Sequence, residues 1–174
     1  MKSCAFTGHR PERFFFKQNE KHPLCEKIKA ALFEQSTALY DKGVKRFYIG
    51  GAQGVDIWAG EVIIKMKKLP EYQDIELICV IPFEGHDSDW DEGIYDRFLK
   101  ICSVCNEIKI ISPSVDPKAF IKRNKYMVDN SDYVIAVYDK KRKLRSGTGQ
   151  TVNYAKKFKR DIIFIHPETA EISY

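Results

Sequence analysis

The sequence has no long apolar run. No stretch approaches the roughly 18–20 consecutive apolar residues that a membrane-spanning helix needs. The residues before Gly8 lack the apolar core of a secretory signal peptide. Cysteine is scarce and odd in number, with five in 174 residues, which argues against a disulfide framework. We therefore expect a cytoplasmic protein without a membrane segment.

Signatures of metal and redox chemistry are also missing. The four histidines show no metal-ligand spacing, and Cys102 and Cys105 form a C-x-x-C pair with no second pair to complete a zinc site. We therefore expect no metal. The net charge is +5, from 29 Lys and Arg against 24 Asp and Glu. Such a mild excess suits an anionic small ligand and permits nucleic acid without requiring it.

Short apolar runs alternate with longer amphipathic ones along the whole chain, as in a β-α-β-α protein. The pattern predicts strands at 4–7, 46–49, 75–81, 107–111, 133–138 and 162–165. It predicts helices at 24–39, 53–66, 90–102, 118–128 and 149–158. This order indicates one α/β domain over 1–174, with a Rossmann-like, doubly wound and mostly parallel sheet of about six strands and helices on both faces.

The turn after the first predicted strand reads TGHRP at 7–11. Ligands of open α/β sheets bind at the carboxyl ends of strands, so Gly8, His9 and Arg10 are candidate ligand contacts. Gly8 lets the backbone approach a ligand closely, and Arg10 supplies a donor fork suited to phosphate. A tight turn with a solvated arginine is the simpler alternative.

A glycine-rich turn, GGAQGVD at 50–56, follows the second strand and opens a helix. N–H groups at a helix N-terminus bind anions. The candidate ligand contacts here are Gly50, Gly51, Ala52, Gln53, Gly54 and Asp56. Asp56 would accept from a ligand hydroxyl or, alternatively, cap the helix. The turn is not a dinucleotide fingerprint and has no P-loop lysine, so NAD oxidoreduction and ATP hydrolysis are not indicated.

A third turn, SGTGQT at 146–151, also lies between a strand and a helix. Its glycines and hydroxyls offer donors to phosphate or ribose, and the candidate contacts are Ser146, Gly147, Thr148, Gly149 and Thr151. The basic run at 140–145 leads into it and is either a ligand-facing segment or a solvated loop. We expect 53–54 and 147–148 to face each other across one crevice.

Further candidates surround these turns. In RNKYMVD at 123–129, Arg123 and Asn124 are expected to project toward the crevice, and Met127 to lie in the core. Asp132 is a candidate ion-pair partner of Arg123. Trp90 would stack on a nucleobase or serve as a hydrophobic lid. Glu84 and Asp129 are further candidate ligand contacts. With Asp56 they are also the carboxylates that could serve catalysis if the protein is an enzyme.

Together the four motifs resemble the SLOG superfamily of Rossmann-like nucleotide-binding domains, and most closely its YpsA-like branch. They occur in the expected order over nearly the whole chain. The turns at 8–10, 54–56 and 146–151 also resemble those of DNA-processing protein A, a relative that binds single-stranded DNA. The resemblance implies a nucleotide-derived ligand, leaves single-stranded nucleic acid as an alternative partner, and suggests a homodimer because related domains often form dimers.

A second relative, the LOG-type phosphoribohydrolase, cleaves the base from a nucleoside monophosphate. Arg123 and Met127 resemble one of its motifs, and Gly147 and Thr148 match part of another. Its catalytic glutamate, however, corresponds to Thr151 here. Without that carboxylate the oxocarbenium-like transition state loses its main electrostatic partner. The resemblance therefore favours a binding or sensing module over an N-glycosidic hydrolase, which remains the enzymatic alternative.

Overall fold

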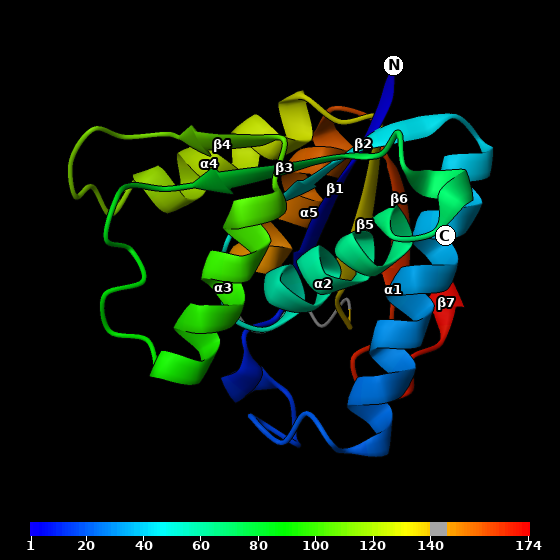
Figure 1. Cartoon of the computed structure of the whole chain (residues 1–174), viewed down its shortest axis with the longest axis horizontal. Helices are drawn as coiled ribbons and strands as arrows, with labels where there is room; N and C mark the ends of the chain where they lie inside the picture. Colours follow the sequence, from blue (N-terminus) through cyan, green and yellow to red (C-terminus); the bar gives the residue numbers. More distant parts are fainter. Residues whose placement is uncertain (140–145) are drawn as a thin grey trace.

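The computed structural model describes residues 1–139 and 146–174, so the basic run at 140–145 lies outside the described residues. A central sheet is covered by helices on both faces (Figure 1). Its strands are β1 (Lys2–Gly8), β2 (Val44–Ile49), β3 (Glu76–Ile81), β4 (Glu107–Ile110), β5 (Tyr133–Val137), β6 (Asp161–Ile165) and β7 (Ile172–Ser173). The helices are α1 (Pro23–Asp41), α2 (Val55–Lys67), α3 (Glu92–Val104), α4 (Ala119–Asp129) and α5 (Gly147–Lys157), with short 3₁₀ turns η1 (Pro11–Arg13) and η2 (Pro70–Tyr72).

The sheet has the order β4-β3-β2-β1-β5-β6-β7. The first six strands pair in parallel, which confirms the Rossmann-like, doubly wound prediction. β7 is an added antiparallel partner of β6. With two residues it is too short to produce an alternating pattern, so the sequence did not indicate it.

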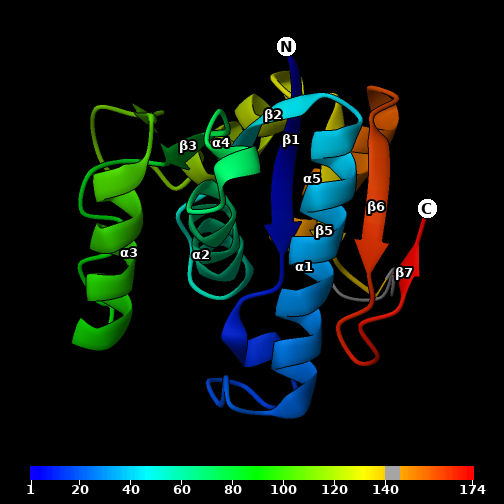
Figure 2. The same cartoon turned by 45° about the vertical axis from the view of Figure 1, so that its right-hand side comes forward.

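The chain winds outward from β1 to β4 and then returns to β5 on the other side of β1. Because parallel crossovers are right-handed, the two halves place their helices on opposite faces. Figures 1 and 2 show α1, α2 and α3 on one face and α4 and α5 on the other. The reversal of direction between β1 and β5 creates a topological switch point, where such sheets bind ligands.

Side chains along β1 and β5 point alternately to the two faces of the sheet, so these strands contribute to the core on both faces. Phe6 and Ile135 point into the main hydrophobic cluster under α1, α2 and α3. Ala5 and Ala136 belong to the smaller clusters on the opposite face. All four side chains are at most 1% exposed, as expected for central strands covered on both sides.

Helix boundaries follow local capping. Gly43 has φ +92° and its N–H bonds to the carbonyl of Tyr40, so it ends α1 as predicted. α5 begins two residues before the predicted 149 because Ser146 caps it: the Oγ of Ser146 accepts from the N–H of Gly149 at 2.9 Å. α3 begins at Glu92 and α2 at Val55, each two residues later than the amphipathic pattern alone indicates.

Candidate functional site

A cavity of about 390 Å³ opens at the switch point, beside the carboxyl end of β1. Three of the four motifs line it with several residues each, and the 50–56 turn contributes two. The candidate residues in its wall are Gly8, His9, Arg10, Ala52, Asp56, Arg123, Asn124, Ser146, Gly147 and Thr148. Segments separated by more than a hundred residues therefore meet in one place, as the strand-end argument predicts.

At the end of β1, each motif residue has a distinct environment. Gly8 packs on α2, where an added Cβ would lie 2.5 Å from the Cγ2 of Val55. His9 is 6% exposed, and its Nδ1 has no hydrogen-bond partner among the described residues. Burial lowers the pKa of His9, so its ring is neutral near pH 7. A neutral, buried imidazole with an unused nitrogen is able to exchange a hydrogen bond with a ligand.

Arg123 connects α4 to the glycine-rich turn after β2. Its side chain is buried and donates a hydrogen bond from Nη1 to the carbonyl oxygen of Gly50. The N–H of Gly50 donates in turn to Oδ1 of Asp56 at 2.8 Å. An added Cβ at Gly50 would overlap Nη1 of Arg123, so a glycine at this position leaves room for the arrangement.

Arg123 and Asp56 also influence each other electrostatically. Burial raises the pKa of Asp56, and the charge of Arg123 acts against that rise. Burial lowers the pKa of Arg123, and Asp56 acts against that fall. The Nε of Arg123 is buried without a hydrogen-bond partner among the described residues. Asp56 does not cap α2, whose N-cap is Gly54 and has no side-chain bond.

The third turn presents the first turn of α5 to the cavity. Ser146 caps the helix, and the Oγ1 of Thr151 donates to the carbonyl of Gly147 at 2.8 Å. Gly147 and Thr148 line the cavity at the N-terminus. N–H groups in a first turn have no partner inside the helix and carry the positive end of its dipole. This wall is therefore suited to an anion.

Several candidates do not line the cavity. Its lining does not include Gly50, Gly51, Gln53, Gly54, Gly149 or Thr151. The crevice predicted between 53–54 and 147–148 has Ala52 in its wall in place of 53–54, and Gly54 lies instead against the segment after β1. Glu84 is exposed, and exposed Asp129 accepts from the hydroxyl of Tyr154 at 3.0 Å.

Trp90 and Asp132 also lie outside the cavity wall. Trp90 packs against His86 and Phe98, with ring centroids 5.7 and 5.4 Å away, at the edge of the main core. The prediction that Asp132 pairs with Arg123 was wrong. Its Oδ2 accepts from the backbone N–H of Ser3 at 2.8 Å, because Asp132 precedes β5 and lies at the amino end of the sheet.

Sequence reasoning missed several residues of the cavity wall. They are Phe6, Glu12, Arg13 and Phe120, together with Thr7 and Met127, which it had placed in a strand and in the core. The ring centroid of Phe120 lies 5.8 Å from the guanidinium of Arg10 and 6.0 Å from that of Arg123. Phe120 precedes Arg123 by three residues on α4, so helical spacing was the signal that could have found it.

The described residues 1–139 and 146–174 contain no group of three or more His, Cys, Asp or Glu arranged to hold a metal ion. In the same residues, no helix has the length and apolar character needed to cross a membrane. The cavity wall instead combines arginines, a helix N-terminus and an aromatic ring.

The fold and the position of the cavity define a Rossmann-like α/β protein of the doubly wound class. The YpsA family model, described as the YspA SLOG family, matches residues 4–170, and the chain belongs to this family. The resemblance found in the motifs is thereby confirmed.

Relatives in sequence and in structure agree with this assignment. UPF0398 proteins from Bacillus thuringiensis (strain Al Hakam) and Bacillus pumilus (strain SAFR-032) are 31% and 30% identical over 144 and 142 residues. Those alignments cover 82% and 80% of this chain and 77% and 74% of the relatives.

Two solved structures of DNA processing protein A share the fold. The Helicobacter pylori protein, described for its single-stranded DNA binding mode, has a TM-score of 0.60 at 21% identity, and the Streptococcus pneumoniae protein has 0.56 at 18%. Each covers 94% of this chain, which spans only 64% and 50% of their respective lengths.

Proposed function

We propose that this protein binds a nucleotide or nucleotide-derived ligand in the switch-point cavity and acts as a cytoplasmic sensor or regulatory module. The observation that carries the proposal is the cavity wall itself. It combines the N-terminus of α5 with Arg10 and Arg123 and with the unpaired Nδ1 of buried His9. Anions bind where helix dipoles and arginine forks converge.

The composition of the wall supports an assignment for each part of such a ligand. A phosphate would lie against the first turn of α5, within reach of Arg10. The nucleobase would stack on Phe120, which is the aromatic residue of the cavity flanked by two guanidinium groups. Asp56 would accept from a ribose hydroxyl, since a carboxylate has acceptor capacity beyond its bond to Gly50.

A ligand panel tests the proposal. Thermal shift and calorimetry with nucleoside mono-, di- and triphosphates, ADP-ribose and NAD should identify at least one compound that stabilises the protein, because a ligand that binds only the folded state raises its stability. Arg10→Gln should weaken that binding by roughly tenfold or more, as expected for loss of a charge-assisted hydrogen bond.

Arg10 is exposed, so its substitution should leave the fold intact. Lys27→Gln removes an exposed positive charge from α1 outside the cavity and is the matched control. If no compound in the panel shifts the melting temperature, or if both variants weaken binding equally, the proposal fails.

An enzymatic alternative rests on one observation: two carboxylates, Glu12 and Asp56, line the cavity. Glu84 and Asp129, also considered from the sequence, lie outside its wall. The Oγ1 of Thr151, at the LOG glutamate position, is used within α5. Incubation with nucleoside monophosphates and NAD, followed by product chromatography, tests for N-glycosidic cleavage. Release of free base by the protein and not by Asp56→Asn would favour the hydrolase.

Single-stranded nucleic acid is the other alternative, and the fold shared with DNA processing protein A motivates it. Binding through phosphate contacts would weaken steeply with salt. Fluorescence anisotropy with a labelled oligonucleotide at several salt concentrations would measure that slope. Absence of binding at low salt would eliminate this alternative and leave the small-ligand proposal untouched.

A further inference from the structure

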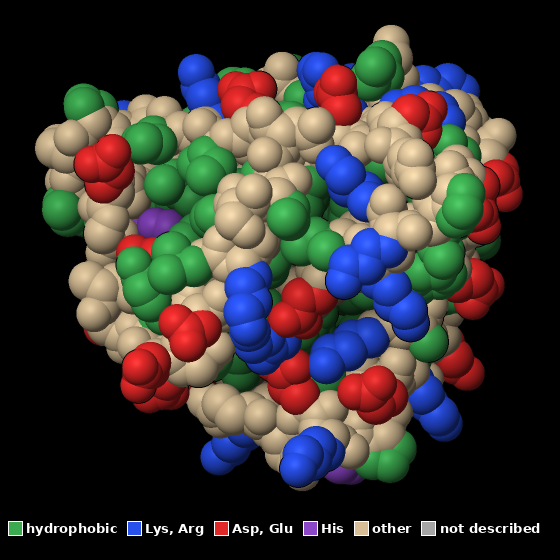
Figure 3. Space-filling model, in the orientation of Figure 1, with side chains coloured by type: hydrophobic (Ala, Val, Ile, Leu, Met, Phe, Trp, Pro, Cys, Tyr) green, Lys and Arg blue, Asp and Glu red, His purple; other side chains and the backbone are tan. Residues whose placement is uncertain are grey.

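Exposed apolar side chains concentrate in one part of the chain. Twelve large hydrophobic residues are exposed among those that the structure describes, and six of them fall within 95–115. These six are Tyr95, Leu99, Val104, Ile108, Ile110 and Val115. They belong to α3, to β4 and to the loop after it, and Figure 3 shows hydrophobic side chains on the left side of the molecule, where Figure 1 places these elements. Apolar clustering of this kind marks an interaction surface.

β4 is the terminal strand of the sheet, paired only with β3 in the described part of the chain. Its four residues are all exposed, in contrast to the mostly buried β3 beside it. An open edge offers a row of backbone hydrogen-bonding groups to another strand. β4 therefore combines an unpaired edge with uncovered side chains.

The two faces of β4 differ in character. Ile108 and Ile110 are in register with Cys79 and Ile81, which point into the main core under α3. The isoleucines are nevertheless 46% and 39% exposed, so α3 does not cover the edge of its own face. Lys109 points the other way, with its Nζ 5.9 Å from the ring centroid of Tyr126 on α4.

We propose that a second copy of this chain covers this surface, by pairing β4 antiparallel with β4 of the partner about a two-fold axis at Ile108. In that register Ile108 faces its own symmetry mate, and Glu107 faces Lys109 of the partner subunit. Directly opposite residues in an antiparallel pair share a face, so the charge pairs form twice on one face and the isoleucines meet on the other.

The sequence of the strand is what selects a second copy over another partner. The segment Glu107-Ile108-Lys109 is complementary to itself when reversed, which an isologous two-fold interface requires. A lysine on an edge strand usually discourages pairing. Here the glutamate two residues earlier would neutralise it in this register alone.

Charge reversal tests the register. Sedimentation velocity and light scattering of the full chain over a range of concentrations should show a monomer–dimer equilibrium. Lys109→Glu places four carboxylates on one face and should weaken dimerisation by roughly tenfold or more, since two favourable cross-strand pairs become two repulsive ones. The double variant Glu107→Lys with Lys109→Glu swaps the charges and should restore the dimer.

A second pair of variants tests the apolar face. Ile108→Lys sets two lysines opposite each other and should also produce monomer. Ile121→Lys is the matched control, because Ile121 is equally exposed at 46% but lies on α4 beside α5, in a small hollow with Gln150 and Tyr154. Circular dichroism and melting temperature would verify that each variant is folded.

Three outcomes would overturn the proposal. One is a chain that stays monomeric at every concentration, which would leave the surface to a different partner. Another is a dimer that persists in folded Lys109→Glu and Ile108→Lys. The third is a folded charge-swapped variant that remains as monomeric as Lys109→Glu. None of these outcomes depends on ligand binding in the switch-point cavity.

Discussion

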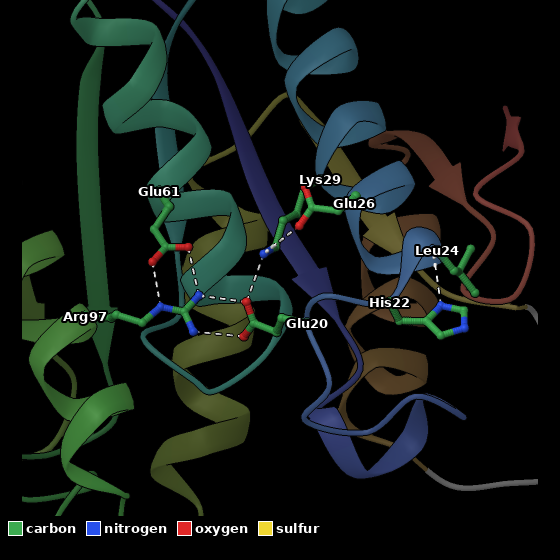
Figure 4. Close-up of polar contacts among 7 residues, drawn as sticks. All are labelled: Glu20, His22, Leu24, Glu26, Lys29, Glu61 and Arg97. Carbon is green, nitrogen blue, oxygen red and sulfur yellow. Dashed lines mark hydrogen bonds and ion pairs between the residues drawn. The ribbon is translucent and has the colours of Figure 1, made fainter.

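Arg97 of α3 donates two hydrogen bonds to Glu20, which lies 77 residues earlier in the segment between η1 and α1. The distances are 2.9 and 3.0 Å, and Arg97 donates two more bonds to Glu61 of α2. Lys29 of α1 also pairs with Glu20 at 2.9 Å, so one network ties three helices to this segment (Figure 4). This segment directly follows the cavity-wall residues at 8–10 and 12–13.

Removing the centre of this network should loosen the segment. We expect Arg97→Gln to lower the free energy of unfolding by about 1–2 kcal/mol, because it leaves two half-buried carboxylates without their shared partner. Urea unfolding measures the loss, and limited proteolysis should detect faster cleavage within 14–22. Arg46→Gln breaks a single half-buried ion pair with Glu76, at 2.6 Å and outside the network, and is the control. If the two variants lose the same free energy of unfolding, the network does not hold the segment more strongly than a single ion pair would.

The same network predicts a dependence of stability on pH. Burial alone would raise the pKa of Glu20, but its hydrogen bonds, first among them those from Arg97, lower it from 4.5 to about 2. A carboxylate with a lowered pKa stabilises the fold above its unfolded value and loses that contribution as pH falls toward the folded value. The network's contribution should therefore be present at neutral pH and vanish between pH 4.5 and 2.

Melting curves of the wild type and of Glu20→Gln measure this effect. The variant should melt well below the wild type at pH 7, and the two curves should converge as pH falls through that window. Glu34→Gln, which removes an exposed carboxylate from α1, controls for the change in net charge. If the difference in melting temperature between the wild type and Glu20→Gln is the same at every pH, the lowered pKa of Glu20 is refuted.

Two glycine substitutions should have opposite effects. Gly50→Ala would place a Cβ against Nη1 and 2.8 Å from Cζ of Arg123, so we expect the free energy of unfolding to fall by about 1–3 kcal/mol from overpacking. Gly93, in the first turn of α3, has nothing within 4 Å of an added Cβ. Gly93→Ala should stabilise the protein by up to about 1 kcal/mol through its better helix propensity. Chemical denaturation of both variants compares the two directly.

Phe120 should matter for ligand recognition and Trp90 should not. Phe120→Leu keeps a large apolar side chain but removes the ring between Arg10 and Arg123, so affinity for a base-containing ligand should fall. Affinity for inorganic phosphate should not change. Calorimetry with both probes separates the two effects. Trp90→Phe retains the packing against His86 and is expected to bind like the wild type, so a stronger defect in Trp90→Phe would reverse the assignment.

Much of the fold could be predicted because its signals are local. β5 is an apolar run that only a doubly covered strand explains, and the helices repeat their apolar residues every three or four positions. Because ligands bind at the carboxyl ends of parallel strands, Gly8, Asp56 and Gly147 could be predicted to lie at one edge of the sheet even though the strand order was unknown.

The contacts that could not be predicted depend on positions distant in the sequence. Arg123 and Asp132 are close along the chain, yet α4 separates their side chains to opposite ends of the sheet. Trp90 was a candidate ligand contact, but its ring packs against the main hydrophobic core. The bond between Arg97 and Glu20 joins α3 to the segment before α1. The hydrophobic pattern of the sequence does not indicate that these two elements are neighbours.

The contact between Gly50 and Arg123 also has a consequence for the history of the family. A side chain at position 50 would enter the volume that the guanidinium of Arg123 fills, so position 50 is not free to enlarge while position 123 carries arginine. Relatives that carry a larger residue at the first position should carry a shorter one at the second. The two positions are expected to vary as a pair across the family's sequences, although 73 residues separate them along the chain.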